Sequence, residues 1–299
     1  MTEAQTESRS IIARIFLSPE EKRLRSGWRL LGFFLISGIS FTIFGALASF
    51  ILLRVLGSNA GENSLFFILQ AVAITAAIYL SRRLLDRRSF ASLGVRWDGQ
   101  AVRDTLVGIG IAAVMMGLIF VVEAGMGWLQ FDSAPADPGS SAALLLWAGI
   151  FLLVGWYEEL LSRGYLLQNL EDGLNTFWAV AISSALFGLA HLGNPNASLV
   201  STIGILAAGV FLAYGYLRTR QLWLPIGLHI GWNFFEGPFF GFPVSGINTF
   251  RLLQHHAVGP EIITGGPFGP EAGLILLPGL ALGTALIYWY TRARNPEQG

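Results

Sequence analysis

Long apolar runs alternate with short polar segments along the chain. Each run approaches the roughly 20 apolar residues that a helix needs to cross the hydrocarbon core of a bilayer. Two shorter runs, near 176–192 and 222–236, are rich in Gly, His or Asn, which suits helices buried in a bundle better than helices facing lipid. The runs fall at about 28–56, 64–81, 105–122, 142–166, 176–192, 198–217, 222–236 and 272–290. The pattern therefore predicts an all-α fold, a polytopic membrane bundle of about eight transmembrane helices.

The same pattern predicts a single membrane domain with short polar ends. Residues 28–291 form this domain, residues 1–27 a basic cytoplasmic segment with a short amphipathic stretch, and residues 292–299 a cytoplasmic tail. Because no small-residue cleavage site follows the first apolar run, we interpret that run as a retained span rather than a secretory leader. The outer segment 237–271 is rich in Gly and Pro and should contain no long helix.

Composition agrees with a membrane location and narrows the chemistry. Hydrophobic residues make up 53% of the chain and charged residues only 13%, against about 25% charged in a typical soluble domain. The net charge is zero, so nothing favours a nucleic-acid partner. The absence of cysteine excludes disulfides, cysteine-ligated metals and thiol nucleophiles.

Basic residues predict the orientation, because Lys and Arg accumulate in cytoplasmic loops. With the N-terminus in the cytoplasm, 17 of the 19 Lys and Arg residues fall in cytoplasmic segments, and only Arg54 and Arg251 do not. The outer loop 123–141 contains acids, Asp132 and Asp137 among them, but no base. We therefore expect an integral protein of a prokaryotic inner membrane with both termini in the cytoplasm.

Three of the predicted spans carry polar residues capable of chemistry. An ionised side chain at mid-span costs roughly 2.5–3.5 kcal/mol, so such a group is a functional hypothesis in itself. The fourth span carries Glu158 and Glu159, the fifth His191, and the seventh His229 and Asn233. Carboxylates and imidazoles in a dry bundle can bind a divalent metal that activates water, or activate water directly as general bases. Either arrangement points to hydrolysis.

Helical spacing suggests how these residues divide the work. Glu159 and Arg163 stand four apart on one helix face, where the cation can anchor the carboxylate, whereas Glu158 points about 100° away. The spacing leaves open which glutamate is the base. His229 and Asn233 are also four apart and project toward a common point. Zinc accepts His and Glu but rarely Asn, so Asn233 fits better as a hydrogen-bond donor to an oxyanion.

Ordered motifs distinguish the chain from other intramembrane hydrolases. It has no HExxH zinc helix, no GxSG serine motif and no GxGD aspartate motif. It has instead EExxxR at Glu158–Arg163, FxxxH at Phe187–His191 and HxxxN at His229–Asn233. Across a motif core at 140–240, the chain resembles the CPBP family, which contains type II CAAX prenyl proteases and bacteriocin-processing enzymes.

The resemblance implies an eight-helix intramembrane endopeptidase that hydrolyses membrane-associated peptides or lipidated protein tails. It implies that Glu158 and His191 activate water, and that His229 and Asn233 stabilise the oxyanion or bind metal. A metallo mechanism would place zinc on Glu158, His191 and His229, while a metal-free, glutamate-dependent mechanism is equally compatible with the residues. The candidate catalytic residues are thus Glu158, Glu159, His191, His229 and Asn233, with Arg163 and Phe187 in support.

Other interpretations of the same residues remain open. A membrane carrier would use buried Glu and His as a relay, although no repeated half supports one, and a non-catalytic scaffold would keep them as a structural cluster. Arg163 could instead extend to the inner membrane surface. Glu236, His255 and His256 are interpreted as surface residues. Ser162 occupies a position that is often bulky and apolar in the family, so the sequence does not determine how a substrate fits there. It does not determine the oligomeric state either.

Overall fold

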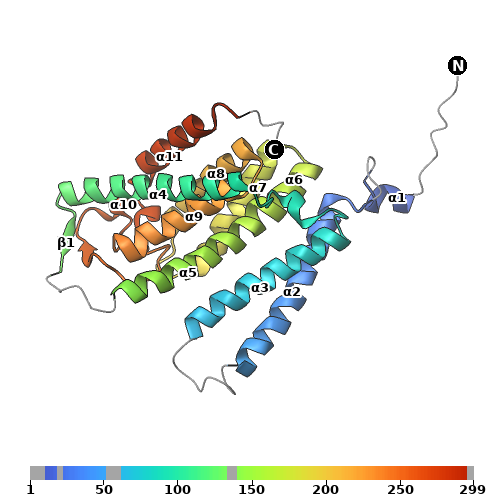
Figure 1. The fold of residues 1–299 in the computed structure, drawn as a ribbon, viewed down its shortest axis with the longest axis horizontal. Helices are drawn as coiled ribbons and strands as arrows, with labels where there is room; N and C mark the ends of the chain where they lie inside the picture. Colours follow the sequence, from blue (N-terminus) through green and yellow to red (C-terminus); the bar gives the residue numbers. More distant parts are fainter. Residues whose placement is uncertain (1–10, 19–22, 52–61, 133–139, 295–299) are drawn as a thin grey trace.

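The structure is a computed structural model that describes residues 11–18, 23–51, 62–132 and 140–294. Predictions that concern the end of the first span, Arg54, Asp137 and the last residues of the tail lie outside the described residues. Two short strands, β1 (Leu129–Phe131) and β2 (His255–Ala257), pair antiparallel beside the helices. The helices (Figure 1) are α1 (Ile11–Phe16), α2 (Ser26–Ile51), α3 (Glu62–Leu84), α4 (Gly99–Gly125), α5 (Ser140–Glu159), α6 (Leu167–Gly173), α7 (Thr176–Ala190), α8 (Leu199–Thr219), α9 (Trp223–Phe234), α10 (Glu261–Thr264) and α11 (Leu276–Thr291).

Each predicted apolar run contains a helix, and the all-α bundle is confirmed. Among the described residues, six helices are long and apolar enough to cross a membrane, with α5 and α6 forming one of them. The other two predicted spans contain the shorter helices α9, of 12 residues, and α11, of 16 residues. A π-helical turn, Phe235–Phe239, extends α9, and the helix ends just after Pro238.

Polar caps fix where the central helices begin. The Asp98 side chain accepts hydrogen bonds from the first turn of α4. Asn175 accepts one from the Trp178 amide at the start of α7, and Ser198 accepts one from the Ser201 amide at the start of α8. Each cap satisfies amide groups that a helix leaves unpaired at its N-terminus. The sharp start of α7 just after α6 sets the direction of the helix that ends at His191.

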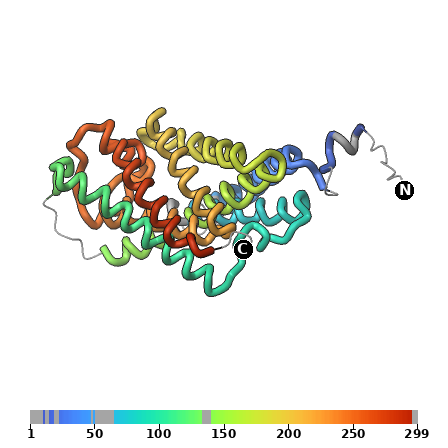
Figure 2. The backbone as a smooth tube through the Cα atoms, turned by 90° about the horizontal axis from the view of Figure 1, so that it is seen from above, coloured from blue at the N-terminus to red at the C-terminus, as the bar shows by residue number. Residues whose placement is uncertain are grey.

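Helix α9 lies in the centre of the bundle, as its composition predicts. Nine of its 12 residues are buried. Its closest neighbour is α4, and the two backbones touch where Gly227 meets the Thr105 carbonyl. From the α4 side, a Cβ at Gly108 would come within 2.6 Å of the Leu224 carbonyl oxygen. Small residues are required where two helices approach this closely. Helix α11 packs against α4 and α8, and Figure 2 shows it alongside α4.

The prediction that segment 176–192 is buried is wrong. Only one stripe of α7 is buried, made of small residues and Phe187. The opposite face is exposed, with Phe177 at 71% and Trp178 at 53%. Helix α7 packs mainly against α8 and α6 and covers the outside of the bundle. Its Gly and Ser residues mark the face that touches α8, and the aromatic residues on the other face determine its exposure.

Ion pairs, buried at Asp86 and partly exposed at Asp172, hold α2, α3 and α6 together at one end of the bundle. Asp86 accepts hydrogen bonds from Arg82 at 2.8 Å and Arg29 at 3.3 Å. Asp172 accepts them from Arg29 at 3.1 Å and Arg23 at 3.0 Å. Removing one member of the buried Asp86 set would leave an uncompensated charge, whereas the Asp172 side chain is 24% exposed and links α6 to Arg29 at the surface. Helix α6 continues α5, so the same contacts also fix the segment that carries the two glutamates.

Candidate active site

The two glutamates lie where α5 changes into a π-helical turn, Leu160–Leu166, before continuing as α6. Such turns are rare in α-helices and are frequent at functional sites. Glu158 and Glu159 face different surroundings. The Glu158 side chain is 21% exposed and lines the main pocket, whereas the Glu159 side chain is fully buried. The structure therefore separates two carboxylates that are adjacent in the sequence.

Glu159 is held by two donors on one oxygen. Arg163 Nη1 donates to its Oε1 at 2.7 Å, and His229 Nδ1 lies 2.8 Å from the same atom. Arg163 also donates from Nη2 to the Gly209 carbonyl of α8, and its guanidinium lies over the Phe187 ring at 4.5 Å. At 1% exposure, Arg163 does not extend to the membrane surface, so that alternative is wrong. It is a buried partner of Glu159.

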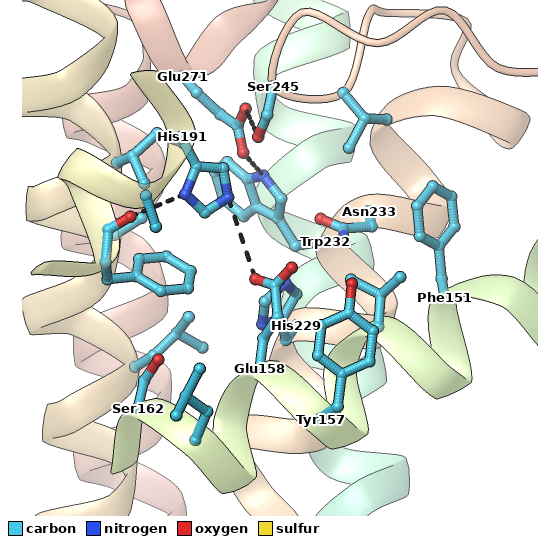
Figure 3. Close-up of a pocket in the computed structure, with 18 of the residues that line it drawn as sticks. Phe151, Tyr157, Glu158, Ser162, His191, His229, Trp232, Asn233, Ser245 and Glu271 are labelled. Atoms are coloured by element: carbon cyan, nitrogen blue, oxygen red, sulfur yellow. Dashed lines mark hydrogen bonds and ion pairs between the residues drawn. The ribbon is translucent and has the colours of Figure 1, made fainter. Parts of the chain in front are cut away.

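His191 lies at the C-terminal end of α7, where the helix ends. Its Nδ1 lies 2.8 Å from the Phe187 carbonyl oxygen one turn earlier and donates a hydrogen bond to it. This contact fixes the ring and leaves Nε2 as the free nitrogen. The side chain is 16% exposed and points into the pocket toward Glu158 (Figure 3). Phe187 thus contributes its backbone to His191 and its ring to both His191 and Arg163.

Glu158 Oε2 lies between two imidazoles. It is 3.7 Å from His229 Nε2 and 4.0 Å from His191 Nε2. The opposite nitrogen of each ring is occupied, by Glu159 in one case and by the Phe187 carbonyl in the other. Among the described residues, Glu158 Oε2 has no hydrogen-bond partner. Three helices thus place one unpartnered carboxylate oxygen beside two Nε2 atoms, at separations that a small polar molecule can bridge.

Asn233 completes the predicted set from the same helix as His229. It lies one turn further along α9, is 7% exposed and lines the same pocket. Figure 3 shows its amide on the other side of Glu158 from His191. The Tyr157 ring lines the pocket next to it. The structure brings together all the residues that the three motifs predict.

The pocket extends from these polar groups into an apolar arm. The volume of the whole pocket is about 590 Å³. The arm runs between α5 and the α2–α3 pair, which diverges from the rest of the bundle in Figure 1. It is lined by aromatic residues from these helices, namely Phe34, Phe66, Phe67, Trp147 and Phe151. The pocket thus joins a polar end, where chemistry could occur, to an apolar surface.

Sequence reasoning missed several polar residues in the pocket, Ser245 and Glu271 among them. Both are in the Gly/Pro-rich outer segment, where no helical spacing relates them to the motifs. Glu271 is 4% exposed and accepts a hydrogen bond from Ser245 Oγ at 2.6 Å. Burial raises the pKa of Glu271 above its ordinary value, and the hydrogen bond from Ser245 opposes that effect. The only sign of Glu271 in the sequence is an acidic residue within a segment rich in Gly and Pro.

The interpretation of Glu236 and His255 as surface residues is wrong. Glu236 is 0% exposed because the loop around Gly269 covers the end of α9. His255 is 2% exposed, because β2 folds it inward against Phe240 and Phe242. His256 is exposed as expected and lies 3.5 Å from Asp132. The sequence could not show how closely the outer segment covers the bundle.

The residues do not form a ready metal site. No three His, Asp or Glu side chains within the described ranges are arranged to hold a metal ion. The Nε2 atoms of His191 and His229 and the Glu158 carboxylate are groups that zinc accepts as ligands. They do not, however, form a three-ligand group arranged to hold a metal ion.

Comparison with known proteins agrees with the three motifs. Residues 140–235 match the family model described as type II CAAX prenyl endopeptidase Rce1-like. This part of the chain, about a third of its length, is similar to that family. The resemblance to the CPBP family is thereby confirmed. The matched region contains every predicted site residue but excludes α2, α3, Ser245 and Glu271.

A relative from Bacillus subtilis strain 168, named "Putative membrane peptidase YdiL", is 31% identical over 111 residues. That match covers 37% of this chain and 41% of the relative, so the chain spans about two fifths of that protein. No protein of known structure matches the chain significantly.

Proposed function

We propose that this protein is an intramembrane endopeptidase in which Glu158 activates the attacking water. The proposal rests chiefly on the unpartnered Glu158 Oε2, which lies between His191 Nε2 and His229 Nε2 at the polar end of the pocket. A water molecule bound there could donate hydrogen bonds to the carboxylate and to the His191 nitrogen. The match to the Rce1-like family model and the name of the Bacillus relative support peptide hydrolysis.

Glu158 suits the role of base better than Glu159. A general base must reach a proton and have a free oxygen to accept it. Glu158 meets both conditions because it faces the pocket. Glu159 Oε2 also has no partner among the described residues, but Glu159 is fully buried outside the pocket and its Oε1 binds Arg163 and His229. We therefore assign Glu159 to orienting His229, and Arg163 to holding Glu159.

The reaction follows from these positions. Glu158 takes a proton from water while the oxygen attacks the peptide carbonyl carbon, and a tetrahedral oxyanion forms. The Asn233 amide donates a hydrogen bond to that oxyanion, and so does His229 when both its nitrogens carry protons. Glu158 then passes its proton to the leaving nitrogen as the C–N bond breaks. His191, fixed by the Phe187 carbonyl, holds the water in line for attack.

The apolar arm indicates the substrate class. A peptide held at Glu158 would extend its neighbouring residues or an attached lipid along the aromatic residues of α2, α3 and α5. Burying apolar surface there is favourable by about 25 cal/mol for each Å² removed from water. We therefore propose membrane-associated peptides and lipidated protein tails as substrates. The arginine distribution supports placing both termini in the cytoplasm of a prokaryotic cell.

The test is cleavage of defined peptides by the purified full-length protein in liposomes. The peptides carry a fluorophore and a quencher on either side of an apolar segment, with and without a lipid anchor, and mass spectrometry identifies the products. We expect cleavage at an internal bond that is lost in Glu158→Ala. Flux of a solute without cleavage would indicate a carrier, and cleavage that persists in Glu158→Ala would exclude the proposed base.

A further inference from the structure

Glu271 borders the polar end of the pocket from outside residues 140–235, which match the Rce1-like family model. It lies in a 3₁₀ turn, Pro270–Ala272, just before α11, and its carboxylate enters the site beside His191 (Figure 3). Its two oxygens have separate partners. Ser245 Oγ donates to Oε2 at 2.6 Å, and Trp232 Nε1 donates to Oε1 at 3.1 Å. Both donors are buried.

These contacts connect the two histidine-bearing helices. Trp232 lies in α9 between His229 and Asn233. On the other side, the Ser245 carbonyl accepts a hydrogen bond from Asn194 Nδ2 at 2.9 Å. Asn194 comes three residues after His191, just beyond the end of α7. A continuous path of hydrogen bonds thus runs from the end of α7 through Ser245 and Glu271 to α9.

The backbone around Glu271 is closely confined. Its carbonyl oxygen lies directly against Gly204 of α8, where any larger residue would collide with it. Ser245 has a φ of +46°, a left-handed conformation that non-glycine residues seldom adopt unless their surroundings hold them there. The next residue, Gly246, donates from its amide to the Phe268 carbonyl at 2.7 Å. The turn and the loop therefore hold the Glu271 side chain in one place.

We propose that Glu271 is a positioning residue that fixes the separation of His191 from His229 and Asn233 across the pocket. The inference rests on the proposed peptidase function. The end of α7 needs such a tie because much of this helix is exposed. Glu158 reaches the two imidazoles at 3.7 and 4.0 Å, and an error of about 1 Å in such a site can reduce the rate about 100-fold.

Two substitutions distinguish the effect of the hydrogen bonds that Glu271 accepts from the effect of the space that its side chain fills. Glu271→Leu removes both acceptors, whereas Glu271→Gln can accept from Trp232 and donate to Ser245. We expect kcat to fall about 10- to 100-fold in Glu271→Leu with KM within about twofold of wild type, and to recover to within about threefold in Glu271→Gln. Glu123→Leu is the matched control, because Glu123 is equally buried in α4, outside the pocket, and has no side-chain partner among the described residues.

Coupling gives a second measurement. If Glu271 acts through Trp232, the double variant Trp232→Phe/Glu271→Leu should lose no more activity than Glu271→Leu alone. Additive losses would overturn the proposal. So would a kcat for Glu271→Leu within threefold of wild type, or a Glu271→Gln variant as slow as Glu271→Leu.

Hydrogen–deuterium exchange tests the bridge without any substrate. Peptides covering 192–197 and 244–247 should exchange faster in Glu271→Leu than in wild type, and Glu271→Gln should restore their protection. If wild type cleaves no peptide, the proposed function fails, while this measurement still tests the bridge. Unchanged exchange in Glu271→Leu would overturn the bridge even if the protein proves to be a peptidase.

Discussion

Glu158 and His229 meet across the pocket from two different helices, with the carboxylate Oε2 3.7 Å from the imidazole Nε2. The other nitrogen of the same ring lies 2.8 Å from Glu159. One imidazole therefore contacts both members of the Glu158–Glu159 pair, through opposite nitrogens. This relationship gives the adjacent acids different roles, because one is committed to His229 and Arg163 while the other faces the pocket.

Replacing Arg163 with alanine should destabilise the fold. The substitution leaves Glu159 buried without its cationic partner, and breaking a buried pair in this way costs about 3–5 kcal/mol. The free energy of unfolding in detergent micelles measures the effect. The control is Arg96→Ala, which removes an exposed pair with Asp98 and should cost less than about 1 kcal/mol. Equal losses in the two variants would contradict the structural role assigned to Arg163.

Asn233→Ala should reduce kcat about 100- to 1,000-fold, the usual cost of removing one donor to an oxyanion. KM should change little, because the hydrogen bond forms mainly in the transition state. Steady-state kinetics in liposomes separates the two constants. Asn233→Asp keeps the size of the side chain but removes the donor, so it should not restore the rate. Full activity in Asn233→Asp would show that this residue does not donate to the oxyanion.

The apolar arm should contribute to binding rather than to chemistry. Phe66→Ala is expected to raise KM about tenfold for a peptide with an apolar or lipidated end, equivalent to about 1.4 kcal/mol of lost contact. Its kcat should be unchanged. Phe177→Ala is the control, because Phe177 is also an exposed aromatic residue but lies on α7 outside the pocket. A similar rise in KM for both variants would argue for a general membrane effect instead.

The proposed mechanism, in which Glu158 itself takes the proton from water, predicts that chelation leaves activity intact. The measurement is elemental analysis of the purified protein together with the cleavage rate after dialysis against a strong chelator. We expect substoichiometric zinc and an unchanged rate. Stoichiometric zinc, with activity that chelation removes and added zinc restores, would show that Glu158, His191 and His229 move to form a metal site.

The sequence predicts the helices well because apolar length is a local property. It also predicts which polar residues meet, since the i, i+4 spacing at His229 and Asn233 and at Glu159 and Arg163 places each pair on one helix face. Which glutamate is free could not be predicted. That depends on the bond between Glu159 and His229, which are 70 residues apart.

The outer segment limits what the sequence can reveal. Glu236 and His255 are buried because a loop with several left-handed glycines, Gly241 and Gly269 among them, folds back over the bundle. Such a path depends on tertiary contacts that leave no periodic pattern. The same limit hid Glu271, whose partners Ser245 and Trp232 are 26 and 39 residues away. In segment 176–192 the small residues indicate close packing of one helix face only, and the opposite face of α7 is exposed.

The most direct test of the account is the single-turnover cleavage rate of Glu158→Gln in liposomes. This substitution keeps the shape of the side chain but removes the base, and general-base catalysis contributes about 100- to 10,000-fold. We predict a loss of rate in that range, with an unchanged free energy of unfolding. Glu123 is a buried carboxylate outside the pocket, so the control variant Glu123→Gln should cleave within twofold of the wild-type rate. A Glu158→Gln protein that cleaves within threefold of the wild-type rate would contradict the claim that Glu158 activates the water.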